Sequence, residues 1–193
     1  MVIGPDTTHA ANKSEYPKID SLLRRAFEKD AEAKLVKRLR KDKDMWHEMI
    51  KPWNGLVGGY AALSRMKSPD GWACLGPVAV RPEFQNGALS PNNENRRYWS
   101  FGTRLVQELC LFYTMPALPN MIERGFPEAI VVLGKKSFYE RAGFNSERAQ
   151  KLASPFPIEH TLIAKAGDDI PEETLVYPDA FIDFLPDYSH TFY

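Results

Sequence analysis

The sequence predicts an α+β domain in which a mixed, mostly antiparallel central sheet, split at a bulge, is flanked by helices. Two amphipathic helical segments are followed by three β-prone segments separated only by turns, which indicates an antiparallel meander. A third helix, a fully apolar strand, a short helix and a last strand come next. The bulge is predicted from a Gly-Pro pair inside the third strand of the meander, because proline cannot donate to a β-ladder.

Length and charge restrict the domain count and the partners. The chain has 193 residues, which favours a single domain over residues 1–193. Lys and Arg together number 25, as do Asp and Glu, so the formal net charge is zero. Because no overall field then favours nucleic acid or an anionic membrane, we expect neither as a partner.

Cysteine usage and the start of the chain favour a cytoplasmic location. Cys74 and Cys110 sit in apolar surroundings without metal-type spacing, which favours buried free thiols in a reducing compartment over a disulfide. No basic segment followed by an apolar run opens the chain, and no apolar stretch approaches the roughly 20 residues needed to span a bilayer. We therefore expect a cytoplasmic protein.

Two helices are predicted near the N-terminus, after a short strand at residues 1–3. Residues 16–27 place their apolar side chains on one helical face, with Ser14 as the N-cap and Pro17 in the first turn. A second helix is predicted to start after Asp30, and its strongly basic outer face is interpreted as a solvated surface.

The meander begins at Met45, where the pattern changes to β-prone runs interrupted by Asn-Gly and Asp-Gly turns. Its three predicted strands cover residues 45–51, 56–66 and 72–80. The Gly76-Pro77 pair lies inside the last of them, so we expect a bulge or a parting of neighbouring strands there.

The second half of the chain alternates loops, helices and strands. Its polar, turn-rich insertion is predicted to be a long surface loop, and its aromatic C-terminal segment is interpreted as a tail. The predicted elements are a loop at about 86–96, a helix at 101–115, a strand at 128–134, a short helix at 135–143, strands at 159–166 and 173–177, and the tail at about 181–193.

Three segments, in this order, carry a resemblance to a known family. They are "GLVGGYAALS" at 55–64, "LGPVAVRPEFQ" at 75–85, and "VVLG" with "FYERAGF" between residues 131 and 144. Together they resemble the Gcn5-related N-acetyltransferase (GNAT) superfamily, and within it the YhbS-like predicted N-acetyltransferases. The likeness extends from about Ile19 to Ala166, and the joint order of the segments makes it specific.

The resemblance implies that acetyl-CoA is a co-substrate and that no metal is needed. Its pantetheine arm would lie in the sheet split, on the main chain of Val78, Ala79 and Val80. Its pyrophosphate would lie at the start of the helix after the loop. The candidates for that phosphate site are Arg97, Ser100, Phe101, Gly102 and Thr103.

This sequence departs from the family pattern at the phosphate site. Ser100 stands where the first glycine usually is, and an insertion of about a dozen residues separates Gln85 from Arg97. Backbone donors do not depend on the side chain unless a positive φ is needed, and a serine hydroxyl adds a further possible phosphate contact. The alternative is a remodelled loop that binds phosphate weakly.

The same resemblance implies that Tyr139 is the general acid. Residues 139–144 match the family's Tyr-x-x-x-Gly-Phe motif, and a phenol with a pKa of roughly 10 can protonate a thiolate whose conjugate thiol has a pKa of about 8.5. Without the upstream segments, Phe138 and Tyr139 would be interpreted as a packing pair.

No residue is identified as the general base. A water relay and deprotonation of the amine before it binds are equally tenable, and Glu128 is the only acid at the strand that follows. His47 is interpreted as a satisfied structural histidine rather than a cleft residue. Asp30 and Glu32 would suit a cationic amine, although helix capping and the helix dipole explain both without a substrate.

The sequence thus predicts an N-acetyltransferase that moves an acetyl group to a primary amine by direct attack. The acceptor is a small molecule or a peptide. The alternative is a non-catalytic acyl-CoA-binding or protein-interaction module of the same fold. The aromatic tail supports that alternative, because such a segment can pack on a partner or on a second subunit to form a homodimer.

Overall fold

The computed structural model describes residues 7–27, 29–87, 100–114 and 125–184, and in this part the strands form one mixed sheet. The sheet has six strands in the order β1-β2-β3-β4-β5-β6, antiparallel except for the parallel β4–β5 pair. They are β1 (His9–Ala10), β2 (Met45–Trp53), β3 (Leu56–Arg65), β4 (Trp72–Val80), β5 (Ala129–Leu133) and β6 (Thr161–Lys165). The predicted α+β class and mixed sheet are confirmed.

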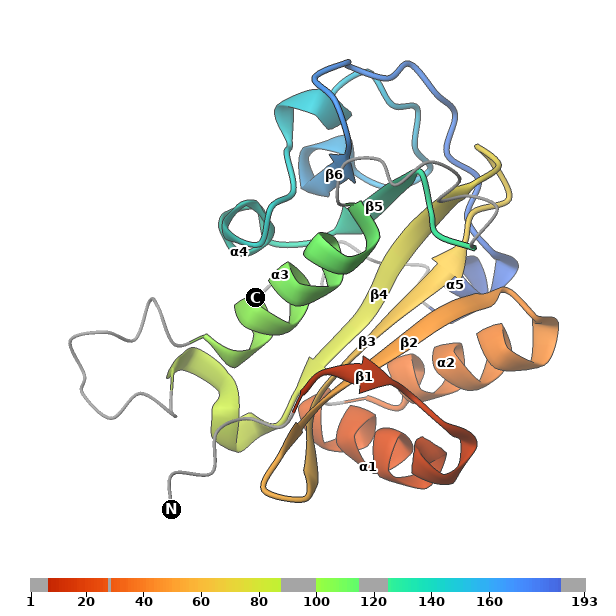
Figure 1. Ribbon diagram of the computed structural model, residues 1–193. Helices are drawn as coiled ribbons and strands as arrows, with labels where there is room; N and C mark the ends of the chain where they lie inside the picture. Colours follow the sequence, from red (N-terminus) through yellow and green to blue (C-terminus); the bar gives the residue numbers. More distant parts are fainter. Residues whose placement is uncertain (1–6, 28, 88–99, 115–124, 185–193) are drawn as a thin grey trace.

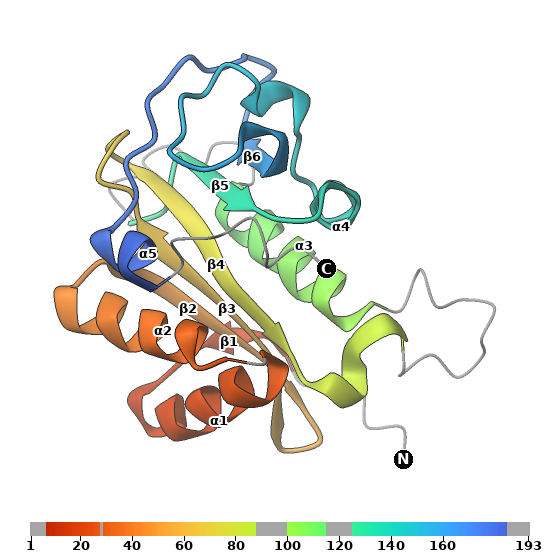
Figure 2. The same ribbon diagram turned by 180° about the vertical axis from the view of Figure 1, so that it is seen from behind.

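Helices cover both faces of the sheet (Figures 1 and 2). One face carries α1, α2 and α5, and the other carries α3 with α4 beside it. The helices are α1 (Tyr16–Ala26), α2 (Ala31–Asp42), α3 (Phe101–Thr114), α4 (Lys136–Arg141) and α5 (Asp179–Phe184). The sheet therefore forms the middle layer of a three-layer arrangement, with apolar side chains packed on both of its faces.

The N-terminal segment differs from its prediction. The strand predicted at residues 1–3 lies outside the described residues, and β1 pairs instead with β2 through His9 and Ala10. Asn12, not Ser14, provides the cap: its side chain accepts from the Ser14 N–H, and Glu15 bonds back to the Asn12 N–H. This capping box opens a short 3-10 turn that leads directly into α1. Asparagine is as good a cap as serine, so the residue type alone does not distinguish Asn12 from Ser14.

The meander forms as predicted because its turn residues adopt the backbone that tight hairpins need. Asn54 and Gly55, between β2 and β3, have φ values of 48° and 75°. Such left-handed values at both central residues match the right-handed twist of the flanking strands. The hairpin sets the register in which β3 becomes a central, almost fully buried strand.

The sheet splits between β4 and β5, as the Gly76-Pro77 pair predicts. The parallel pairing of β4 with β5 runs from Trp72↔Ala129 to Leu75↔Val132 and ends there. On its other side β4 stays paired with β3, but the register shifts by one residue across Gly76-Pro77, which gives β4 a bulge. Residues 76–80 of β4 therefore have a strand neighbour on one side only among the described residues.

The C-terminal region corrects two predictions. Residues 173–177 form only isolated bridges at Thr174 and Val176, not a strand. The segment from residue 181 is not simply an exposed tail, because Phe181 belongs to α5 and is 0% exposed in the core beneath α2. Residues 185–193 lie outside the described residues, and the homodimer stays a prediction.

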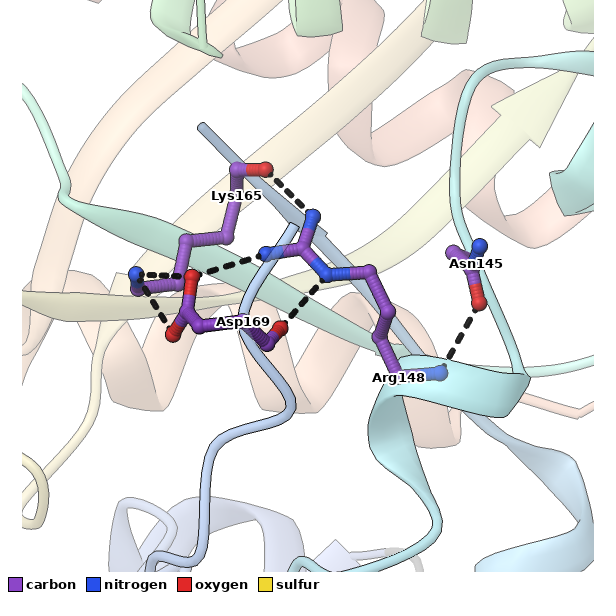
Figure 3. Close-up of polar contacts among 4 residues, drawn as sticks. All are labelled: Asn145, Arg148, Lys165 and Asp169. Carbon is purple, nitrogen blue, oxygen red and sulfur yellow. Dashed lines mark hydrogen bonds and ion pairs between the residues drawn. The ribbon is translucent and has the colours of Figure 1, made fainter. Parts of the chain in front are cut away.

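The turn after β6 is held by Arg148 (Figure 3). The guanidinium donates to the carbonyl oxygens of Lys165 and Asp169 at 2.7 and 2.8 Å. The ammonium of Lys165 lies 3.0 Å from both carboxylate oxygens of Asp169. Because Lys165 pairs with Ala129 at the start of β5, this network fixes the end of the β5–β6 pair that lies away from the split.

Candidate active site

The main chain of β4 faces the gap at two of the three predicted positions. Arg81 N–H donates to the Gly58 carbonyl at 3.0 Å, so this pair is hydrogen-bonded across β3 and β4. Because hydrogen-bonded and non-bonded pairs alternate in an antiparallel ladder, the N–H and C=O of Val78 and Val80 point away from β3. Those of Ala79 point toward β3. Val78 and Val80 are also half-exposed on a strand whose other described residues are buried.

Gln85 closes one end of the gap. Its side-chain amide donates to the carbonyl of Val80 at 2.9 Å. The Val80 carbonyl is thus on the gap side, as the ladder alternation requires, and it is already partly satisfied. The glutamine of the "RPEFQ" segment has a definite local role, which is to hold the chain where β4 ends.

The N-terminus of α3 is positioned by one aromatic ring. Phe101 is buried, and its ring occupies the space above Gly58 and Gly59 of β3. A Cβ atom on Gly58 would lie 2.7 Å from the Phe101 ring, and one on Gly59 would lie 2.9 Å from it. The glycine pair of the "LVGG" segment therefore allows α3 to start directly against the sheet. Phe101 can offer a ligand only its main chain.

Ser100 caps α3. Its hydroxyl accepts from the Thr103 N–H at 3.3 Å, and its carbonyl accepts from the Arg104 N–H at 3.1 Å. These are the bonds of a helix N-cap. The Thr103 hydroxyl is buried and has no hydrogen-bond partner among the described residues. Arg97, the remaining phosphate candidate, lies outside the described residues, as does most of the predicted 86–96 loop.

Gly102 joins the two halves of the site. A Cβ atom on Gly102 would lie 3.1 Å from Cγ2 of Val80 and 3.4 Å from the ring of Phe138. The Phe138 ring in turn meets the Tyr139 ring edge to face, with centroids 4.8 Å apart. The structure therefore brings together the open stretch of β4, the start of α3 and the aromatic pair of α4.

Tyr139 lies in a close-fitting apolar setting. Its ring packs edge to face on Phe144, with centroids 5.7 Å apart, and lies directly against Gly134 at the end of β5. Burial raises the pKa of the Tyr139 hydroxyl, and negative charge on Cys74 or Cys110 would raise it further. The phenol therefore stays protonated at neutral pH.

A raised phenol pKa is compatible with proton donation to a thiolate in the same place. The Cys110 thiol belongs to the same apolar cluster, and burial raises its pKa to about 12. Any thiolate in this cluster would become a stronger base for the same reason. Burial therefore raises both the pKa of the phenol, which donates the proton, and the pKa of the thiol that forms when the thiolate accepts it.

Two other predicted candidates lie elsewhere. The Nε2 atom of His47 is 2.9 Å from the Gly125 carbonyl, the ring stacks on Tyr113, and burial lowers its pKa. These contacts agree with the structural role predicted for His47. Glu128 lies at the start of β5, where its N–H donates to the Gly71 carbonyl, at the opposite end of the strand from the gap.

The structure separates the two acids of the α1–α2 connection. Asp30 is exposed and forms an ion pair with Arg24. Glu32 is buried, and its Oε2 atom has no hydrogen-bond partner among the described residues. Sequence reasoning treated the two alike, since both occupy positions suited to helix capping.

In the described part of the chain, neither grouped metal ligands nor membrane-spanning helices are found. No three His, Cys, Asp or Glu side chains are grouped there so that they could hold a metal ion. None of the helices in residues 7–27, 29–87, 100–114 and 125–184 is both long and apolar enough to cross a membrane.

Comparison with known proteins identifies the family. No family model matches the chain. The chain is 32% identical over 147 residues to the uncharacterized N-acetyltransferase YhbS of Escherichia coli K12. The matched segment covers 74% of this chain and 75% of the relative. The crystal structure of Escherichia coli YhbS, a GNAT family N-acetyltransferase in complex with CoA, matches with a TM-score of 0.70 and 27% identity over 91% of each chain.

A second solved structure shares the fold. It is a GNAT family acetyltransferase from Brucella melitensis in complex with acetyl-CoA, with a TM-score of 0.63 and 21% identity over 91% of this chain and 97% of the other. The shared fold and the identity to YhbS over 75% of that protein show that the chain belongs to the YhbS-like N-acetyltransferases of the GNAT superfamily.

Proposed function

We propose that this protein transfers the acetyl group of acetyl-CoA to a primary amine by direct attack, without a covalent enzyme intermediate. The observation that carries the proposal is the gap beside Val78 and Val80, which lies next to both the start of α3 and the Tyr139 helix. Membership of the N-acetyltransferase family supports the reaction class. The CoA in the YhbS structure and the acetyl-CoA in the Brucella melitensis structure support the co-substrate.

The gap fits the extended pantetheine arm. Main-chain groups of Val78 and Val80 would bind the amides of the arm as a neighbouring strand would, and Ala79 would line the gap with its main chain turned to β3. At the start of α3, the N–H groups of Phe101 and Gly102 would bind the pyrophosphate, helped by the positive end of the helix dipole. The hydroxyls of Ser100 and Thr103 are additional donors, and Arg97 is proposed as the cationic one.

When bound, acetyl-CoA supplies a thioester carbonyl that a neutral amine can attack. Tyr139 would hold a proton on its hydroxyl at neutral pH and donate it to the departing thiolate. Gly134 and Phe144 would fix the ring for that transfer, since both contact it directly. The wall formed by Phe138 and Tyr139 would exclude water.

The second candidate is a non-catalytic CoA-binding module. It is favoured by Ser100, whose hydroxyl already bonds the Thr103 N–H that a phosphate would otherwise use. Weak phosphate binding would then leave a fold that holds acyl-CoA without turning it over. We also propose that residues 1–193 form one domain and that the buried cysteines Cys74 and Cys110, which form no disulfide, reflect a reducing, cytosolic location.

The test combines binding with turnover. We expect acetyl-CoA to raise the thermal midpoint, and a panel of primary amines to release free CoA, which a thiol reagent detects. Tyr139→Phe should reduce this release by about 10²- to 10⁴-fold, the usual contribution of a general acid, while it leaves the acetyl-CoA-induced thermal shift intact.

A matched control is Tyr113→Phe. Tyr113 is a buried tyrosine of the apolar cluster against which Tyr139 packs, but its hydroxyl faces the sulfur of Met49 at 3.6 Å. It should keep full activity. Stabilisation by acetyl-CoA without release of CoA from any amine would support the binding module, and no stabilisation would contradict both candidates.

A further inference from the structure

A buried carboxylate at the start of α2 has one oxygen atom without a partner among the described residues. Glu32 is only 6% exposed, and its Oε2 atom is buried without a hydrogen-bond partner among the described residues. Buried carboxylates are normally ion-paired or fully hydrogen-bonded, because the charge is costly to remove from water. A carboxylate left in this state is a candidate for binding a ligand.

Glu32 lies on the buried face of α2, which packs against the sheet. Leu35, three residues later, packs in the cluster that contains Cys74 of β4 and Leu133 of β5. Val36, four residues later, packs in the cluster that contains Ala79 of β4. Residues three and four apart share a helix face, so Glu32 lies between these two directions, one turn closer to the helix start.

Cys74 and Ala79, the β4 members of these two clusters, bracket the stretch of β4 at which the sheet splits. This stretch contains the bulge at Gly76-Pro77, where β4 leaves β5. Tyr139 belongs to the apolar cluster on the opposite, α3-covered face of the sheet. The carboxylate and the phenol therefore lie on opposite faces of the sheet.

We propose that Glu32 binds the acceptor amine in its ammonium form and removes its proton, as the general base of the reaction. This inference rests on the proposed acetyl transfer. The ammonium proton passes to the Glu32 carboxylate, which releases it to solvent, and the nitrogen lone pair forms the C–N bond to the acetyl carbon. The nitrogen then gives its second proton to Glu32, which leaves a neutral amide. The C–S bond breaks with its electron pair on sulfur, and the thiolate takes the Tyr139 proton. Solvent then returns a proton to Tyr139 and removes one from Glu32.

The electrostatics of Glu32 suit this role. Burial raises the pKa of its carboxyl group, while its bond to its own N–H and the nearby Lys29 lower it by less. A carboxylate of raised pKa is a stronger base, closer to the operating pH. A primary amine that arrives as a cation would also supply the missing partner for the buried charge.

The test compares Glu32→Gln with Asp30→Asn. The second variant removes a carboxylate from the same α1–α2 connection, but an exposed one paired with Arg24. We expect Glu32→Gln to lower kcat/KM for the amine by about 100-fold or more and Asp30→Asn to change it less than threefold. The residual activity of Glu32→Gln should rise tenfold per pH unit up to the pKa of the amine, because only amine already deprotonated in solution can react.

Stability distinguishes this role from a structural one. When folding raises the pKa of a carboxyl group, the protein loses stability as the pH rises from the pKa of that group in the unfolded chain, about 4.3, through its pKa in the folded protein. Glutamine carries no such penalty. The thermal midpoint of Glu32→Gln should therefore exceed that of the wild type by a margin that grows above pH 4.3 and then becomes constant. A lower midpoint for Glu32→Gln at neutral pH would indicate a structural carboxylate and overturn the proposal.

Failure of this inference is distinguishable from failure of the acetyl transfer. If the wild type acetylates amines and Glu32→Gln retains kcat/KM within threefold with an unchanged pH profile, Glu32 is not the base, and the proposed function stands. If the wild type releases no CoA with any amine, the proposed function fails, and the role of Glu32 fails with it.

Discussion

A methyl group on Gly134 would overlap the ring of Tyr139, lying 3.0 Å from its Cδ2 atom and closer still to Cε2. Gly134 directly follows β5, and Tyr139 lies on the helix that comes next. The absence of a side chain at one residue thus determines where the proposed acid can lie. A glycine at this point is required for packing, since its φ is not in the left-handed region.

Gly134→Ala should therefore destabilise the protein and displace Tyr139. We expect a loss of about 1 to 3 kcal/mol, the usual effect of overpacking, together with lower activity. Thermal or chemical unfolding and CoA release measure the two effects. Combining Gly134→Ala with Tyr139→Ala tests the cause, because the double variant should be more stable than the sum of the single effects predicts. Strict additivity would contradict the clash.

Gly58→Ala should weaken CoA binding from a distance. The new methyl group would meet the Phe101 ring and move the start of α3, where the pyrophosphate is proposed to bind. Calorimetry should show weaker binding of CoA, with a higher Kd. Unfolding experiments should show that the substitution lowers the free energy of unfolding by about 1 to 3 kcal/mol. Phe101→Leu in the Gly58→Ala background should recover part of the affinity by removing the obstructing ring atoms. An unchanged Kd in Gly58→Ala would contradict a pyrophosphate site at the start of α3.

Ser100→Asp separates the cap of α3 from its proposed phosphate contact. Aspartate caps helices as well as serine does, so stability should hold. The added negative charge would repel the pyrophosphate, so the affinity for CoA should fall, and more so at low salt. Ser100→Ala provides the complement, with a loss of about 1 kcal/mol of stability and a smaller change in Kd. Equal CoA affinity in Ser100→Asp and the wild type would place the phosphate elsewhere.

Tyr60→Phe should reduce stability without changing catalysis. The Tyr60 hydroxyl donates to Glu48 at 2.7 Å, and Glu48 also accepts from Arg40 of α2. Loss of a buried bond to a carboxylate costs about 1 to 3 kcal/mol. The kcat and KM should stay within twofold of the wild type, because this network ties α2 to β2 and β3 rather than to the gap. A large change in KM would contradict this prediction and show that the position of α2 at the site depends on the Tyr60 hydroxyl.

Local sequence signals predicted the elements whose shape depends on their own residues. The Asn54-Gly55 turn and the Gly76-Pro77 bulge were predicted because glycine and proline impose particular backbone geometry wherever they lie. The helices with a continuous apolar face were also predicted from local signals, because the spacing of their apolar residues indicates that face directly. The split in the sheet, which positions Val78 and Val80, follows from that local chemistry.

Elements stabilised by distant contacts were not predicted. Helix α5 has only six residues and forms because Phe181 packs beneath α2, far away in sequence. Strand β1 has two residues and exists only by pairing with β2. Glu32 could not be told apart from Asp30, because burial depends on the whole fold and both acids follow the same local rule for helix starts.

The split also creates two strand edges inside the protein. An unpaired edge at the rim of a sheet is a site where another chain can add and where aggregation begins. Here the open stretch of β4 lies inside the fold, with helices on both faces of the sheet (Figure 1). The amide protons of Val78 and Val80 should exchange rapidly with deuterated water in the free protein and slowly once CoA is bound. Residue-resolved hydrogen exchange would thus report directly when the missing strand has been supplied.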